Sequence, residues 1–189
     1  MIQSKADLRF YIQEDKKRNL LGKKMSYAKF IYKRFIGTED VVACIYLECL
    51  RNYEYAINCR KGFIGSVIRA FYRAKLMRLS LKYHLQIAPN TVGYGLWLLH
   101  FRIGGGIILN VRKMGNYCSA NAGVVIGNKD KQENIPILGD RVTLTTGCKV
   151  IGAIKIGDNV IVAPNAVVTH DVPDNAIVGG VPAKVIKFK

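Results

Sequence analysis

Residues 138–167 read LGDRVT LTTGCK VIGAIK IGDNVI VAPNAV, and every block of six opens on an aliphatic residue. Four places after each opening residue stands a second apolar residue. The opening residues, with one further copy, are Leu138, Leu144, Val150, Ile156, Val162 and Val168, and the second set is Val142, Cys148, Ile154, Val160, Ala166 and Val172. A fixed short repeat of this kind indicates a solenoid, in which each repeat is a small unit stacked on its neighbours.

The six-residue spacing predicts a three-sided parallel β-helix. Each hexapeptide supplies one short strand and one corner, its aliphatic residue points inward, and three hexapeptides complete one coil. Gly139-Asp140 and Gly157-Asp158-Asn159 fall at corners, where Gly, Asn and Asp tolerate left-handed dihedral angles. Earlier copies stand at Met114, Ala120 and Ile126, with Cys118 and Val124 in the second position. The alternative, a β-sandwich, has turns about every eight to twelve residues and therefore the wrong spacing.

The repeat is interrupted between Ile126 and Leu138 by a polar segment, residues 128–136. Insertions in stacked repeats map to loops on one face. We therefore expect a loop extruded from a corner of the β-helix.

The front of the chain has a helical period instead. Apolar residues recur at three- and four-residue steps between Glu39 and Arg60, and a second helix is expected from about Ile64 to Tyr83. Thr38 is the expected N-cap of the first of these helices. Breaks between helical runs are expected at Gly22, Gly37, Gly62 and Gly65. The sequence thus predicts a basic α-helical region over residues 1–85 and a β-helix domain over residues 86–189.

Composition excludes several classes of protein. Of 189 residues, 50% are hydrophobic and 22% charged, which excludes a disordered chain. The longest apolar stretch, Val41–Leu50, is about half the length of roughly twenty residues that a membrane-spanning helix needs. The first residues lack the apolar core of a secretory signal, so we expect a cytoplasmic protein. The five cysteines are an odd number without a Cys-x-x-Cys motif, and we expect reduced thiols.

The net charge of +16 is concentrated in the front, where residues 1–82 carry 18 Lys and Arg against 7 acidic residues. Such a surplus suits nucleic acid, anionic lipid or a phosphate-bearing substrate. No nucleic-acid-reading motif is present, so we expect no nucleic-acid partner. Peripheral contact of the basic N-terminal helices with the inner membrane surface is one possibility that charge suggests. Histidines and cysteines lack metal-ligand spacing, and no metal is expected.

From residue 86 onward several motifs belong together. They are IAPNTVGYGLWLLH at Ile87–His100, GIILN at Gly106–Asn110, MGNYC at Met114–Cys118, VVIGN at Val124–Asn128 and DVPDNAIVGGVPAKVI at Asp171–Ile186. With them the chain resembles the left-handed β-helix acyltransferases with hexapeptide repeats, in particular serine acetyltransferases and the related sugar and polysaccharide O-acetyltransferases. The resemblance implies a left-handed parallel β-helix and an acetyl-CoA-dependent O-acetyltransferase.

The resemblance also implies roles for individual residues. His100 matches the histidine that removes the proton from the acceptor hydroxyl, a task suited to an imidazole because its free pKa lies near neutrality. The acceptor would contact Gln86, Arg102 and Asn110. Acetyl-CoA would lie in a groove between adjacent subunits of a homotrimer, contacted by Thr146, Pro164, Thr169, Lys184 and Lys187, the two lysines meeting its phosphates. For the lysines the alternative is a solvated C-terminal tail, and for His100 a structural corner residue.

Three positions depart from the serine acetyltransferase pattern. Gln86 stands where that family has an aspartate that orients the histidine, Leu99 where it has an aspartate that holds the amino acid, and Ile135 near its second histidine. Unpaired buried charge is expensive. The sequence therefore favours a sugar or polysaccharide hydroxyl as the acceptor. A serine O-acetyltransferase of cysteine biosynthesis and a non-catalytic β-helix scaffold remain the alternatives.

Overall fold

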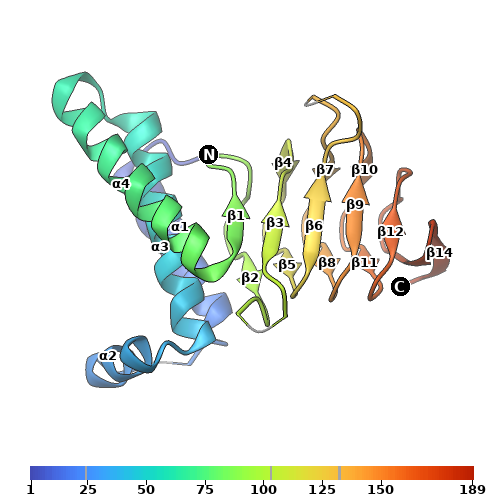
Figure 1. The fold of residues 1–189 in the computed structure, drawn as a ribbon, viewed down its shortest axis with the longest axis horizontal. Coiled ribbons are helices and arrows are strands. Elements are labelled where there is room, and N and C mark those ends of the chain that lie inside the picture. The colour runs from blue at the N-terminus through green and yellow to red at the C-terminus, as the bar shows by residue number, and fades with distance from the viewer. Residues whose placement is uncertain (24, 103, 132) are drawn as a thin grey trace.

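The computed structural model describes residues 1–23, 25–102, 104–131 and 133–189. In these residues a group of helices stands at one end of a stack of short strands (Figure 1). The helices are α1 (Lys5–Asn19), α2 (Tyr27–Ile36), α3 (Glu39–Cys59) and α4 (Gly62–Tyr83). The chain then passes from Tyr83 at the end of α4 almost directly into the first strand at Leu85.

The strands form three ladders, which are the three faces of a β-helix. The first face contains β1 (Leu85–Ile87), β3 (Ile107–Leu109), β6 (Val124–Gly127), β9 (Lys149–Ile151) and β12 (Val167–Val168). The second face contains β4 (Lys113–Met114), β7 (Ile137–Leu138) and β10 (Lys155–Ile156). The third face contains β2 (Trp97–Leu98), β5 (Ser119–Ala120), β8 (Thr143–Leu144), β11 (Ile161–Val162), β13 (Ala176–Gly180) and β14 (Ala183–Phe188). Only the last pair, β13 and β14, is antiparallel among the pairs of these strands.

The hexapeptide repeat sets this architecture, and the predicted left-handed parallel β-helix is confirmed. Residues eighteen positions apart pair in register, as Leu144 does with Val162 on the third face. Every opening and second residue of the repeat is buried in the apolar core. The parallel ladders exclude the β-sandwich alternative. Residues 128–131 and 133–136 form the long connection between β6 and β7 (Figure 1).

The helical front follows the sequence closely, with one exception. Gly37 ends α2 in the left-handed conformation (φ 70°), as its predicted role as a break requires. Thr38 does occupy the N-cap of α3, although its side chain makes no capping hydrogen bond. The break predicted at Gly65 is wrong, because this glycine lies inside α4. A Cβ there would stand 2.7 Å from the Arg60 carbonyl oxygen, so glycine is required for this close approach rather than for a turn.

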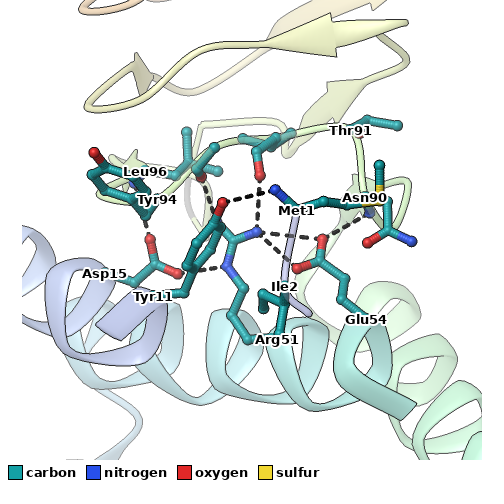
Figure 2. Close-up of polar contacts among 12 residues, drawn as sticks. Met1, Ile2, Tyr11, Asp15, Arg51, Glu54, Asn90, Thr91, Tyr94 and Leu96 are labelled. Carbon is teal, nitrogen blue, oxygen red and sulfur yellow. Dashed lines mark hydrogen bonds and ion pairs between the residues drawn. The ribbon is translucent and has the colours of Figure 1, made fainter. Parts of the chain in front are cut away.

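A buried charge cluster joins the helices to the first coil (Figure 2). The Arg51 guanidinium, fully buried on α3, pairs with Asp15 of α1 at 2.8 Å and with Glu54 at 3.0 Å. It also donates to the backbone carbonyl oxygens of Val92 at 2.9 Å and Gly93 at 2.6 Å. Two carboxylates and two carbonyls thus surround one cation, which compensates for its removal from water. The cluster fixes α1 and α3 against the open end of the β-helix.

Within the described residues, no helix combines the length and the apolar character that crossing a membrane would require. All five cysteines are unpaired. Cys118 and Cys148 fill second positions of the repeat, and burial raises the pKa of each thiol to about 12. These two thiols therefore pack the core and stay protonated at neutral pH.

Candidate functional site

His100 lies at the corner where the third face turns into the first. The ladder pairs Leu98 with Ala120, Ala120 with Leu144, and Leu144 with Val162. The residues two places further along each strand therefore form one column down this corner. We call it the histidine corner, and its members are His100, Ala122, Thr146 and Pro164. Register thus places the predicted base on the same edge of the β-helix as two of the predicted acetyl-CoA contacts.

The backbone at His100 is held in an unusual conformation. Its φ is 56°, in the left-handed region, and its side chain is exposed. The next residue, Phe101, is fully buried, and its amide donates a 2.9 Å hydrogen bond to Glu39 Oε1 at the start of α3. An ionised acceptor makes this bond stronger than one between neutral groups. Phe101 and Glu39 together anchor the chain directly after the imidazole.

The corner at His100 is longer than the corners below it. Eleven positions separate the inward residues Leu98 and Leu109, whereas six separate Ala120 and Ile126. The extra chain forms a short turn in which the Gly104 amide donates to the His100 carbonyl at 3.0 Å. A Cβ on Gly104 would collide with the Cβ of Ala122, so glycine allows the turn to lie directly on the next coil. Ile103 lies outside the described residues.

A groove of about 1040 Å³ opens beside this turn, between the end of α4 and the first face. We call it the α4 groove. It brings together the three predicted acceptor contacts, Gln86 on β1, Arg102 in the turn and Asn110 after β3. Two further basic side chains, Arg73 and His84, line it as well. The remaining lining is mostly apolar and, among the described residues, includes no carboxylate.

His100 itself is not among the residues that line the α4 groove. The groove reaches the neighbouring Phe101 and Arg102 instead, and Arg102 lies over the Tyr83 ring at 6.0 Å. The three predicted acceptor contacts thus share a groove whose lining does not include the imidazole. A single subunit does not show the imidazole and these contacts converging on one point.

The predicted acetyl-CoA contacts separate into two groups. Thr146 and Pro164 are neighbours on the histidine corner, where the amide of the next residue, Asn165, donates to the Thr146 carbonyl at 2.9 Å. Lys184 pairs with Gly179 at the C-terminal end of the same edge and is exposed. Thr169 follows β12, at the end of the first face that is remote from the histidine corner. The register of the ladder aligns it with Asn110, so it lies on a different corner from Thr146 and Pro164.

Lys187, the second predicted phosphate contact, lies three residues along β14 from Lys184, roughly 10 Å away in an extended strand. It pairs with Ile177, on the side of the strand remote from the histidine corner. In one subunit Lys184 is therefore the lysine nearer to this corner. The role of Lys187 remains a prediction.

Sequence reasoning missed Glu39, Arg73 and the place of His84 in the α4 groove. Glu39 lies 62 residues before its partner Phe101, so no local pattern links the two. His84 ends α4 in the left-handed conformation and enters the groove only because α4 packs on β1. Among the residues that the structure describes, no group of three or more His, Cys, Asp or Glu side chains is placed to bind a metal ion.

Comparison with known proteins agrees with this fold. No family model matches the chain. A serine acetyltransferase of Synechococcus elongatus is 36% identical over 106 residues, which are 54% of this chain and 42% of that protein. A serine acetyltransferase of Helicobacter pylori strain J99 is also 36% identical, over 54% of this chain and 60% of its own length. One of Bacillus subtilis is 29% identical over 157 residues, 78% of this chain and 71% of that protein. The chain thus spans only about half the length of the first two relatives.

Solved structures of the same kind share the fold over nearly the whole chain. The serine acetyltransferase of Brucella abortus strain S19 superposes with a TM-score of 0.72, 20% identity, and coverage of 97% of this chain and 70% of that one. The Neisseria gonorrhoeae serine acetyltransferase in complex with serine superposes with a TM-score of 0.68 and 22% identity, and the match covers 97% of this chain and 71% of that one. The expected resemblance is therefore confirmed: this chain is a hexapeptide-repeat, left-handed β-helix protein related in sequence to serine acetyltransferases.

Proposed function

We propose that the chain is an acetyl-CoA-dependent O-acetyltransferase whose acceptor is serine. The observation that carries the proposal is the place of His100, an exposed imidazole in one column with Thr146 and Pro164. Relatives with 36% identity are named serine acetyltransferases, and a serine acetyltransferase solved in complex with CoA has this fold (TM-score 0.67, 19% identity, 97% of this chain and 72% of that chain).

In the proposed reaction His100 acts as the general base. The neutral imidazole accepts the proton of the acceptor hydroxyl as its oxygen attacks the carbonyl carbon of the thioester. The carbon–sulfur bond of the resulting tetrahedral intermediate then breaks, and the thiolate of coenzyme A takes the proton from the imidazolium. The products are the O-acetyl ester and free coenzyme A, and the imidazole returns to its neutral form. The bond between Glu39 and the Phe101 amide holds the chain that carries this ring.

Acetyl-CoA is proposed to lie along the histidine corner, against Thr146 and Pro164. Lys184 would meet a phosphate as a point charge at the end of this edge, while Thr169 and Lys187 would be reached from a second subunit. Exposed apolar side chains on β14, among them Val185, Ile186 and Phe188, are available for contact between subunits. We therefore propose a homotrimer in which each acetyl-CoA lies between two protomers.

The sequence alone predicts a sugar hydroxyl as the acceptor, and the comparisons give this prediction no support. The relatives favour serine, which was the alternative. One structural observation keeps the sugar as a second candidate: the described lining of the α4 groove offers Arg102 and Arg73 for a carboxylate but no carboxylate for an ammonium group. A sugar hydroxyl acceptor needs no such partner.

The experiment is release of the free thiol of coenzyme A from acetyl-CoA, measured with the full chain and parallel acceptors. L-Serine, the serine analogue without the ammonium group (3-hydroxypropionate), nucleotide sugars and short oligosaccharides are offered at equal concentrations. We expect turnover with L-serine and also with 3-hydroxypropionate, because the described lining of the α4 groove includes arginines for the carboxylate and no carboxylate for the ammonium group. Turnover with sugars and none with serine would contradict serine as the acceptor and favour a sugar hydroxyl. If the chain neither bound acetyl-CoA nor turned it over, the proposed activity would be wrong and the chain would be a non-catalytic β-helix scaffold.

A further inference from the structure

Helix α2 exposes an apolar face that the fold does not use. None of its ten residues is buried, and α2 packs along the end of α3, away from the strands (Figure 1). Phe35 is 90% exposed and Tyr27 80% exposed, and Ile31, Tyr32 and Ile36 are exposed too. Leaving large apolar side chains in water forgoes the favourable free energy of covering them. The helix thus presents a surface suited to a partner.

The apolar residues of α2 occupy one side of the helix. With about 100° of rotation per residue, Tyr27, Ile31 and Phe35 form one stripe, and Tyr32 and Ile36 lie beside it within the same half of the circumference. Lys29 and Arg34 fall at the two borders of this half and are exposed. An apolar half bordered by cations is typical of helices that lie in a membrane surface.

The charge around α2 has a single sign. Between Lys16 and Thr38 the sequence contains eight Lys or Arg residues and no Asp or Glu. Of the cations near the helix, Lys33 pairs with Asp40 of α3, while Lys23, Lys29 and Arg34 are exposed. Each basic residue beside an anionic bilayer adds favourable electrostatic attraction. The segment is therefore complementary to a negatively charged surface.

We propose that α2 is a membrane-surface anchor that binds anionic phospholipid bilayers. Tyr27, Ile31 and Phe35 enter the boundary between headgroups and acyl chains, and Lys29 and Arg34 contact the lipid phosphates. Tyr27, 80% exposed, suits this boundary because its ring is apolar and its hydroxyl can stay in water, while Phe35, 90% exposed, offers a wholly apolar ring to the acyl chains. The anchor does not depend on the acetyltransferase reaction, and it would hold the catalytic domain beside the bilayer.

Two other occupants fit the surface less well. A second copy of α2 would bring cations of like sign together, which destabilises contact between two identical faces. The phosphates of a nucleic acid would pair with Lys29 and Arg34, but a nucleic acid has no hydrocarbon region to cover the aliphatic side chains of Ile31 and Ile36. A bilayer accommodates both the charge and the apolar side chains.

The test is sedimentation of the full chain with vesicles of phosphatidylglycerol mixed with phosphatidylcholine, and with vesicles of phosphatidylcholine alone. We expect binding to the mixed vesicles that salt weakens, and little binding to the neutral ones. Phe35→Ser should weaken binding about tenfold or more, because one large apolar group no longer enters the bilayer. Lys29→Glu together with Arg34→Glu should weaken it by at least about tenfold.

Matched control variants test whether the effects belong to α2 or follow from the loss of any exposed apolar ring or cation. Phe63→Ser removes a phenylalanine that is 84% exposed on α4, and Lys113→Glu with Lys131→Glu reverses two exposed cations of the β-helix. Both controls should bind as the unchanged chain does, and circular dichroism should show the same helix content throughout. Absence of vesicle binding, equal loss in the controls, or loss of a multimer of the chain on Phe35→Ser would overturn the proposal. So would tight DNA binding that is insensitive to Phe35→Ser.

Discussion

At the scale of single residues, the proposed chemistry depends on how the imidazole of His100 is held. The residue has a left-handed backbone, and the Phe101 amide that follows it is tied to Glu39 of α3 at 2.9 Å. A hydrogen bond to a charged group contributes about 1.5–3 kcal/mol. Glu39 is thus a positioning residue, which acts on the imidazole through the backbone.

Replacing Glu39 tests this positioning role. Glu39→Ala removes the acceptor of the Phe101 amide, and we expect kcat to fall about tenfold while KM for acetyl-CoA stays unchanged. Glu39→Gln keeps an oxygen acceptor and should restore most of kcat. Steady-state kinetics and thermal unfolding of the three proteins provide the measurement. If both variants lost stability equally and kept kcat, Glu39 would be purely structural.

A corner glycine provides a second prediction at this scale. Gly147 follows Thr146 on the histidine corner with φ 73°, and a Cβ there would collide with Asn165 Oδ1. Gly147→Ala should lower the free energy of unfolding by at least about 1 kcal/mol. Gly127→Ala is the matched control, because a Cβ at Gly127 meets nothing within 4 Å. Equal stability of the two variants in urea denaturation would contradict the packing of this corner.

At the scale of elements, the Arg51 cluster determines how the helices are fixed to the first coil. Arg51→Ala leaves Asp15 and Glu54 buried without their cation, and we expect a loss of about 3–5 kcal/mol in the free energy of unfolding. The control is Lys16→Ala, which removes a half-exposed pair with Glu48 and should cost no more than about 1 kcal/mol. Urea denaturation followed by circular dichroism measures both, and similar losses would argue against the cluster as the joint.

The elements also show what the sequence could predict. The hexapeptide register located the inward residues of the β-helix, because a strict six-residue period permits one arrangement of strands and corners. The start of α3 and the end of α4 match the expected residues, and the other two ends differ by one residue for α3 and two for α4, since amphipathic period and flanking glycines define these helices. The break predicted at Gly65 is wrong because a glycine needed for close packing looks the same in a sequence as one needed for a turn.

The candidate site could be predicted only in part. His100, Thr146 and Pro164 follow from motif position and repeat register, and the structure does place them in one column. The contact between Glu39 and Phe101, and the α4 groove, depend on how α3 and α4 pack on the first coil. On α3, Arg51 donates to the carbonyl oxygens of Val92 and Gly93 in the first coil, 41 and 42 residues away, and no local period records these contacts.

At the scale of the whole molecule, the proposed placement of acetyl-CoA requires more than one chain. We expect sedimentation equilibrium to give a mass of three times the chain mass of 21.1 kDa at micromolar concentration. Truncation of exposed apolar side chains on β14, by Ile186→Ser with Phe188→Ser, should lower this mass if β14 contributes to the contact. A chain that remains monomeric and still turns over acetyl-CoA would contradict the shared groove.

The most direct measurement compares the turnover of acetyl-CoA by the unchanged chain and by two histidine variants. The acceptor is the one that gives turnover in the thiol-release experiment. His100→Ala should lower kcat by a factor on the order of 10² or more, because the general base is lost, with an unchanged melting temperature and molecular mass. His170→Ala removes an exposed imidazole beyond the far end of β12 and should leave kcat as it was. If His100→Ala turned over acetyl-CoA as fast as the unchanged chain, the assignment of the histidine corner as the catalytic site would be wrong.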